Sequence, residues 1–254
     1  MRDARTWDVT VGEGPVAAVA IHNGHDIRPD LEDLVALDDE RRRREEDPFT
    51  ERLAAVVPTR IVVHRSRFEV DLNRDRDDAV CVVPEECWDL HVWASPPDDR
   101  VLEEARRIYD RFYAQLEQLL RGIVARYERF AVLDVHSYNH RRGGPNAPPA
   151  DPAQNPEVNV GTGSMPRDRW AHLVERFVDD LAGCGLDVRE NVKFRGRRLA
   201  AFVHETFPDS GCCLAIEFKK MFMDELTGEL FEPELRRLER CLAGTLPGLR
   251  ESLR

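Results

Sequence analysis

The sequence has few of the features that mark nucleic-acid-binding, membrane and secreted proteins. Its 254 residues include 37 Lys and Arg against 48 Asp and Glu, a net charge of -11. A surface with this balance repels the phosphate backbone, so we expect no nucleic-acid partner. The longest aliphatic run, residues 16–21, is far too short to span a bilayer, and residues 1–10 lack the apolar stretch of a secretory signal. We therefore expect a cytoplasmic chain with no membrane partner.

Cysteine pairs with the spacing of a zinc ribbon or a redox motif are also absent. The six cysteines include no Cys-x-x-Cys pair, and Cys212 is adjacent to Cys213. Because nothing else in the sequence points to an oxidising compartment, we expect all six cysteines to be reduced and buried. Cys87 and His91 could in principle form a nucleophile and base pair, but the sequence around them lacks the sharp turn motif that presents a catalytic nucleophile.

Alternating strand and helix patterns predict the fold class. Four apolar segments are typical of strands buried on both faces, and they cover residues 16–22, 60–64, 130–136 and 213–218. Apolar side chains recur at helical spacing over residues 101–127 and 170–181, and again near residues 235–242. A chain that is 42% hydrophobic can bury a large core. We expect one domain over residues 1–254, a three-layer α/β sandwich with a mixed, largely parallel sheet.

Two segments have the composition of loops or exposed elements. Residues 141–159 follow the third strand and hold five of the 16 prolines, which favours a mobile loop that forms one wall of a site. Residues 38–47 are a charge run with four consecutive arginines, typical of a solvated helix or loop. In this fold class ligands bind beyond the carboxyl ends of the strands, where the polar residues of this sequence gather.

Two histidines come at the ends of separate predicted strands. His22 follows the first strand, whereas Asp134 and His136 share one face of the third because strand side chains alternate. Neutral imidazole is a good zinc ligand, and a hydrolytic zinc site needs three protein ligands and one open position. The two histidines could share one ion, with Asp134 orienting a ligating ring from behind.

A cluster of arginines follows the second predicted strand. Guanidinium groups bind carboxylates with two parallel hydrogen bonds, so Arg67 and Arg74 could hold an anionic substrate. Asn73 would add an amide donor. The composition equally allows a structural network of ion pairs. Its acidic members would be Glu69, Asp71 and Asp75.

One carboxylate interrupts the last apolar strand. Glu217 stands in the sequence Ala-Ile-Glu-Phe, and a lone buried carboxylate is costly unless it is paired or functional. It is therefore a candidate general base with a raised pKa. Lys219 or Lys220 could instead neutralise it.

These motifs occur in an order that resembles the N-formylglutamate amidohydrolase family over about residues 15 to 230. The segment of residues 66–74 and the Asp-x-His-Ser element are the most specific parts of the resemblance. The family is in turn similar to zinc carboxypeptidases and amino-acid deacylases, which share a sheet-centred fold. The motifs are His22-Asn-Gly, Glu46-Asp47 followed by Glu51-x-Leu53, Ser66-Arg67-x-x-x-Asp71-Leu72-Asn73-Arg74, Asp134-x-His136-Ser137 and Ile216-Glu217.

The resemblance implies an amidohydrolase with one zinc ion that converts N-formyl-L-glutamate to formate and glutamate, a step of histidine degradation. It implies His22 and His136 as zinc ligands and Asp47 as the third. Carboxypeptidases use His-x-x-Glu for their first two ligands, so His25, three residues after His22, competes for that role. Glu217 would move the proton, with Arg67 assisting at the carbonyl oxygen. The implied substrate-binding residues are Arg67, Asn73, Arg74, Ser137 and Tyr138.

Two other functions compete with this interpretation. A zinc carboxypeptidase would use the same residues on a peptide carboxyl terminus instead of a small anionic N-acyl amino acid. A binding protein could keep the fold without turnover, although the presence of both histidines and the glutamate disfavours it. The sequence does not specify the oligomeric state.

Overall fold

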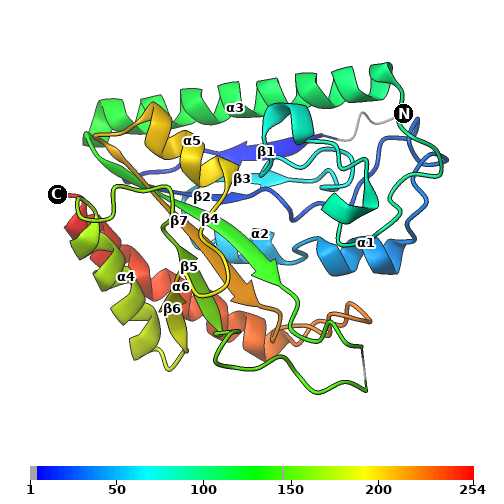
Figure 1. Cartoon of the computed structure of the whole chain (residues 1–254). Coiled ribbons are helices and arrows are strands. Elements are labelled where there is room, and N and C mark those ends of the chain that lie inside the picture. The colour runs from blue at the N-terminus through cyan, green and yellow to red at the C-terminus, as the bar shows by residue number, and fades with distance from the viewer. Residues whose placement is uncertain (1–4, 145) are drawn as a thin grey trace.

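The structure is a computed structural model that describes residues 5–144 and 146–254. Its centre is a seven-stranded sheet with the order β1-β3-β2-β4-β7-β5-β6 (Figure 1). Strands β3, β2, β4 and β7 are parallel, whereas β1 pairs antiparallel with β3 and β5 pairs antiparallel with β7. The sheet is therefore mixed and largely parallel, as predicted. The strands are β1 Trp7–Thr10, β2 Val16–Ala20, β3 Thr59–Val63, β4 Phe130–Tyr138, β5 Val158–Gly161, β6 Val188–Glu190 and β7 Gly211–Lys219.

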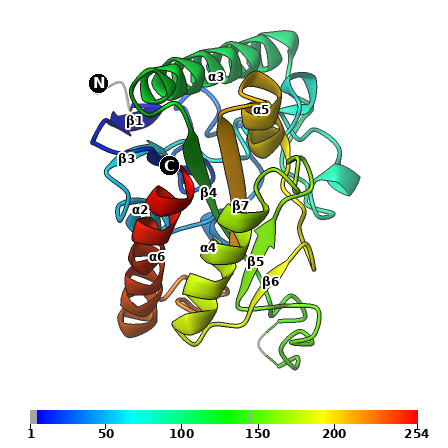
Figure 2. The ribbon, with the colours of Figure 1, turned by 90° about the vertical axis from the view of Figure 1, so that its left-hand side faces the viewer.

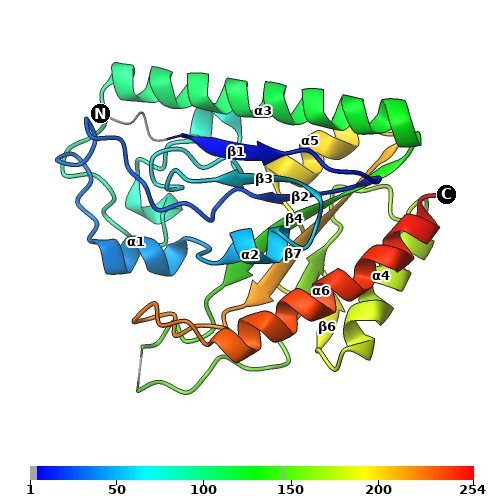
Figure 3. The ribbon, with the colours of Figure 1, turned by 180° about the vertical axis from the view of Figure 1, so that it is seen from behind.

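Helices cover both faces of the sheet and complete three layers. Helices α3 and α5 lie on one face, and α2, α4 and α6 lie on the other (Figures 2 and 3). The predicted three-layer α/β sandwich is confirmed. The helices are α1 Asp39–Glu45, α2 Thr50–Ala54, α3 Asp99–Tyr127, α4 Ala171–Gly183, α5 Arg198–Thr206 and α6 Glu232–Ser252, with two 3-10 turns at Arg76–Asp78 and Pro84–Glu86.

The alternation of side chains explains why the central strands are apolar throughout. In β2, Ala17 and Val19 pack into the core under α3, while Val16 and Ala18 pack into the core on the other face. Every residue of β2 and β4 is buried, as expected for parallel strands covered on both sides. Helix α3 begins after Asp98, whose carboxylate accepts a hydrogen bond from the Val101 amide.

The predicted strands and the three predicted helices are present, with ends shifted by a few residues. The structure adds β1, β5, β6, α2 and α5, which are short or carry weak periodicity. The charge run forms helix α1, yet Arg42 is buried there instead of solvated. The predicted loop over residues 141–159 extends too far, because β5 begins at Val158. Residue 145 of that segment lies outside the described residues.

Two disulfides contradict the prediction that all cysteines are reduced. Cys81 pairs with Cys87, and Cys184 pairs with Cys241. Only Cys212 and Cys213 are free, and both are buried in the sheet. The sequence could not reveal the pairs because pairing depends on how close the cysteines lie in the folded chain. The second pair, for example, joins residues 57 positions apart, at the end of α4 and within α6. Because disulfides persist mainly in oxidising compartments, the two pairs do not support the expected cytoplasmic location.

None of the helices within residues 5–144 and 146–254 combines the length and the apolar character needed to traverse a membrane.

Candidate metal centre

The sheet brings distant chain segments to one edge. His22 comes two residues after the end of β2, and His136 lies near the end of the adjacent β4. In the parallel pair β4 and β7, His136 is in register with Glu217. Asp47 lies in the segment between α1 and α2, and its backbone N–H donates a 2.8 Å hydrogen bond to the carbonyl of His22. Residues far apart in sequence therefore meet at the carboxyl ends of the parallel strands.

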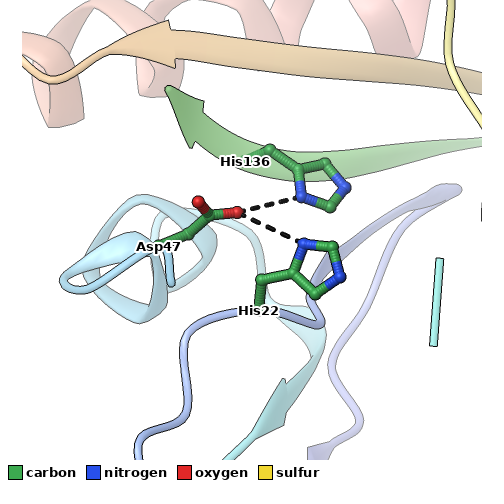
Figure 4. Close-up of side chains that lie close together, drawn as sticks. All are labelled: His22, Asp47 and His136. Atoms are coloured by element: carbon green, nitrogen blue, oxygen red, sulfur yellow. Dashed lines mark hydrogen bonds and ion pairs between the residues drawn. The ribbon is translucent and has the colours of Figure 1, made fainter. Parts of the chain in front are cut away.

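His22, Asp47 and His136 form a compact, fully buried group, here called the His–Asp–His group. One ligand atom from each lies within 4.8 Å of the others. Figure 4 shows one carboxylate oxygen of Asp47 directed to a nitrogen of each ring. Its Oδ2 atom is 3.1 Å from Nδ1 of His136 and 3.5 Å from Nδ1 of His22. Two imidazole nitrogens and one carboxylate oxygen are a donor set that suits Zn²⁺.

The opposite nitrogen of each ring faces a second buried carboxylate. Nε2 of His22 lies 2.7 Å from Oδ1 of Asp71, and Nε2 of His136 lies 2.8 Å from Oδ1 of Asp134. Such carboxylate partners fix the orientation of a ligating imidazole and make it a better donor. With Nε2 engaged in this way on both rings, the Nδ1 atoms are the ones directed to Asp47. The residues present therefore fit a metal ion.

His25 belongs to a different network. Its Nδ1 lies 2.6 Å from Oε2 of Glu46, and its Nε2 lies 3.2 Å from Nη2 of Arg42. His25 is partly exposed and is not a member of the His–Asp–His group. Of the two residues that competed for the third position, Asp47 is the one beside His22 and His136.

The electrostatics of the group follow from burial and close pairing. Burial opposes ionisation of Asp47, but hydrogen bonds from His136 and His22 outweigh it and hold the pKa of the carboxyl far below its usual value. Burial likewise opposes charging of His136, but Asp134 and Asp47 outweigh it and raise its pKa. The group therefore attracts positive charge strongly.

Glu217 has the opposite tendency. Burial raises its pKa to about 8; His136 opposes this shift, while the carboxylates of Asp47 and Asp134 add to it. Lys220 does not neutralise it, since its Nζ donates to the backbone carbonyls of Arg44 and Glu46 at 2.6 and 2.7 Å. Within the described residues, no cation lies within 4.0 Å of its carboxylate. Glu217 is thus a carboxyl group poised to exchange a proton near neutral pH.

All nine residues predicted to act in the site line one cavity of about 530 Å³. This volume is in the range of small-molecule sites. The sequence predicted this convergence for eight of the nine, because they lie at or after the ends of parallel neighbouring strands. The family resemblance added Asp47. The nine are His22, Asp47, Arg67, Asn73, Arg74, His136, Ser137, Tyr138 and Glu217.

Arg67 and Arg74 of the arginine cluster both contact a carboxylate of the protein. This agrees in part with the competing interpretation, a structural network of ion pairs. Arg67 donates to Oδ2 of Asp71 from Nη2 at 2.8 Å and from Nε at 3.2 Å. Nε of Arg74 lies 3.5 Å from the same oxygen. Nδ2 of Asn73 is 3.4 Å from Nε2 of His136, while its Oδ1 accepts from the amide of Leu199. Asp71 thus connects the arginines to His22.

The cavity also contains residues that sequence reasoning missed. Three cations come from the connection between β6 and α5, which carried no strand or helix signal. The one available clue was the unusual density of basic residues in the sequence Lys-Phe-Arg-Gly-Arg at positions 193–197. Trp88 is a further missed residue, and its ring lies 4.8 Å from the guanidinium carbon of Arg67.

Comparisons with known proteins show which family and which folds this chain is similar to. The family model described as N-formylglutamate amidohydrolase matches residues 14–223. A crystal structure of N-formylglutamate amidohydrolase from Ralstonia eutropha JMP134 is 23% identical, with a TM-score of 0.73, and the match covers 97% of this chain and 96% of that one. The structure of gene product Atu2144 from Agrobacterium tumefaciens is 17% identical, with a TM-score of 0.67 and the same coverage. At these identities the two structures show a shared fold. A search of curated proteins found no significant match.

Proposed function

Because the chain belongs to the N-formylglutamate amidohydrolase family, we propose that it is a zinc-dependent enzyme that hydrolyses N-formyl-L-glutamate, or a related N-acyl amino acid. The products would be formate and glutamate, a step of histidine degradation. The observation that carries the proposal is the buried His–Asp–His group with Glu217 in register beside His136. We also propose that residues 1–254 act as a single catalytic domain.

The zinc ligands in this proposal are His22, Asp47 and His136. Three protein ligands leave a coordination position open, as catalytic zinc sites require. When bound, zinc acts as a Lewis acid and lowers the pKa of water to about 7. Asp71 and Asp134 would orient the two imidazoles through their Nε2 atoms, which supports the assignment.

Glu217 would move the proton. Hydrolysis of an amide forms a carbon–oxygen bond with water and breaks the carbon–nitrogen bond. A proton must therefore leave the water and reach the departing nitrogen. Glu217 lines the cavity, and its pKa of about 8 lets its carboxyl group accept and return a proton near neutral pH.

The arginine cluster would bind and orient the substrate. Asn73 and Arg74 would hold the carboxylate next to the scissile amide, since amide and guanidinium donors match a carboxylate. Arg67 would stabilise negative charge on the carbonyl oxygen. In the structure Arg67 is already hydrogen-bonded to Asp71, which keeps its guanidinium in place on the cavity wall. Ser137 and Tyr138 would contact the substrate from the end of β4.

The direct experiment measures formate release from N-formyl-L-glutamate by zinc-loaded protein, with the bound metal quantified in the same sample. We expect turnover that requires zinc and is lost with a chelator. A short peptide serves as the second substrate: preferential release of its C-terminal residue would reassign the enzyme as a carboxypeptidase. Full zinc occupancy without turnover of any N-acyl amino acid would reject the proposal in favour of a binding protein.

A further inference from the structure

One wall of the cavity is a short basic segment, residues 193–197, here called the cationic loop. It connects β6 to α5 and reads Lys-Phe-Arg-Gly-Arg. All five residues line the cavity that holds the His–Asp–His group and Glu217. The loop thus places three cations, Lys193, Arg195 and Arg197, on one side of the site.

These three cations lack acidic partners. Within the described residues, no carboxylate lies within 4.0 Å of the charged group of Lys193, Arg195 or Arg197. The polar contact of Lys193 is with a neutral atom, because its Nζ donates to Oδ1 of Asn155 at 2.6 Å. By contrast, Arg142 on the same cavity pairs with Glu45 at 2.9 Å. In a chain with a net charge of -11, three cations without ion pairs in one cavity indicate a site for an anion.

The backbone of the cationic loop is held in place by β5. Oδ1 of Asn159 accepts the amide of Lys193 at 2.8 Å, and Nδ2 of Asn159 donates to the carbonyl of Phe194 at 2.8 Å. The carbonyl of Arg195 accepts the amide of Gly163 at 2.7 Å. Gly196 has a φ of 86°, a conformation that favours glycine. A backbone fixed in this way keeps the three exposed side chains on the cavity wall, so binding has to order the side chains but not the loop.

The loop extends between two parts of the site. At one end, Arg197 shares a second hollow with Asn73 and Arg74, the residues proposed to hold the carboxylate next to the amide. At the other end, Nζ of Lys193 lies 5.3 Å from the ring of Tyr138 at the end of β4. A substrate held by Asn73 and Arg74 can therefore direct a second anionic group to the loop.

We propose that Lys193, Arg195 and Arg197 bind the distal carboxylate of a dicarboxylic N-acyl amino acid and select it over analogues with an uncharged side chain. This inference rests on the function proposed above. The analogue that tests it is N-formyl-L-glutamine, which has nearly the same shape as N-formyl-L-glutamate and keeps the carboxylate beside the amide, but has an uncharged side chain. A charge-assisted contact to the distal carboxylate should favour the glutamate derivative by about tenfold or more in kcat/KM.

The experiment measures kcat/KM for both substrates in zinc-loaded protein. A variant with Lys193→Gln, Arg195→Gln and Arg197→Gln should lower the preference to about twofold or less, because kcat/KM falls for N-formyl-L-glutamate alone. The matched control is Arg111→Gln, an exposed arginine of α3 that does not line the cavity, and it should keep the wild-type preference. Circular dichroism would verify that the variant is folded.

Two outcomes would overturn the inference. If the cations only attract anions in general, or if they bind the carboxylate beside the amide, the triple variant lowers kcat/KM equally for both substrates. The ratio of the two kcat/KM values is then unchanged. If neither substrate is hydrolysed, the proposed function fails, and calorimetry with L-glutamate and L-glutamine tests the loop separately. Equal dissociation constants for these two ligands in the wild-type protein would then exclude a distal carboxylate site.

Discussion

Asp71 holds His22 and Arg67 at once. Its Oδ1 atom lies 2.7 Å from Nε2 of His22, and its Oδ2 atom accepts two hydrogen bonds from Arg67. Burial opposes ionisation of Asp71, but Arg67 and His22 outweigh it and keep the pKa of the carboxyl well below its usual value. One carboxylate thus sets the position of both a proposed metal ligand and a proposed catalytic cation.

Replacing this carboxylate should weaken metal binding without removing a ligand. We expect Asp71→Asn to lower zinc affinity by about 10- to 100-fold, since His22 loses the partner that orients it. Titration with a chromophoric chelator measures the affinity. The control is Asp168→Asn, an exposed carboxylate that does not line the cavity, which should bind zinc as tightly as the wild type. Equal affinity in Asp71→Asn would show that Asp71 does not support His22.

The choice between Asp47 and His25 is open to a direct comparison. We expect Asp47→Ala to reduce bound zinc to well below one ion per chain, because one of three ligands is lost. His25→Ala should keep one ion, since His25 interacts with Glu46 and Arg42 instead. Elemental analysis of both purified variants measures the stoichiometry. The reverse pattern would assign the third position to His25.

Glu217→Gln should separate metal binding from catalysis. The variant keeps the size of the side chain and all three proposed ligands, so zinc content should be unchanged. We expect kcat to fall by about 100-fold or more, because general acid–base catalysis typically contributes that factor. Formate release under saturating substrate measures it. Full activity would remove Glu217 from the mechanism.

The two disulfides should have different effects on function. Cys81–Cys87 closes the turn that carries Trp88 over Arg67 and the carbonyl of Glu86 that accepts from Arg74. Replacing this pair by serine should raise KM about threefold to tenfold by loosening the cavity wall. Replacing Cys184 and Cys241 should leave KM unchanged.

The two disulfides should rank in the opposite order by their effect on the free energy of unfolding. Chain entropy predicts a loss of about 4 kcal/mol for the pair 57 residues apart and about 2 kcal/mol for the pair six residues apart. Urea denaturation of both double-serine variants measures these losses. Equal effects of the two variants on KM would contradict a role for the Cys81–Cys87 bond in the cavity.

His204 should make the protein less stable in mild acid. Its Nε2 accepts the amide of Cys213, Nδ1 contacts Ser164, and burial lowers its pKa to about 4. Between pH 6.5 and 4 the unfolded chain gains a proton that the folded protein excludes. The free energy of unfolding should therefore fall as the pH falls, by up to about 1.4 kcal/mol per pH unit. Comparing wild type with His204→Gln over this range isolates the contribution, and identical slopes would refute it.

The sequence predicted the parts of the site that follow strongly apolar strands. His22, His136 and Glu217 could be placed together because β2, β4 and β7 are apolar, largely buried and parallel. Family resemblance then added Asp47, which lies in a connection whose course no periodicity predicts. The sequence of residues 66–74 could not show whether Arg67 contacts the substrate or pairs with Asp71. A guanidinium group binds a carboxylate of the substrate and a carboxylate of the protein equally well.

The remaining misses share a physical cause. Strands β5 and β6 have four and three residues, too few for an alternation to be recognised. The cationic loop lacks regular structure, so its place beside the cavity depends on contacts with Asn159 that only the folded sheet creates. The disulfides likewise depend on tertiary proximity.

The reversed direction of β5 has a consequence for how this scaffold can diversify. Because β5 runs antiparallel beside β7, the connection from β4 leaves and re-enters the sheet at the same rim. Insertions or deletions in that connection can therefore reshape the mouth of the cavity while every strand keeps its partners. New substrate ranges can arise by changing segment length alone, with the proposed catalytic groups left in place.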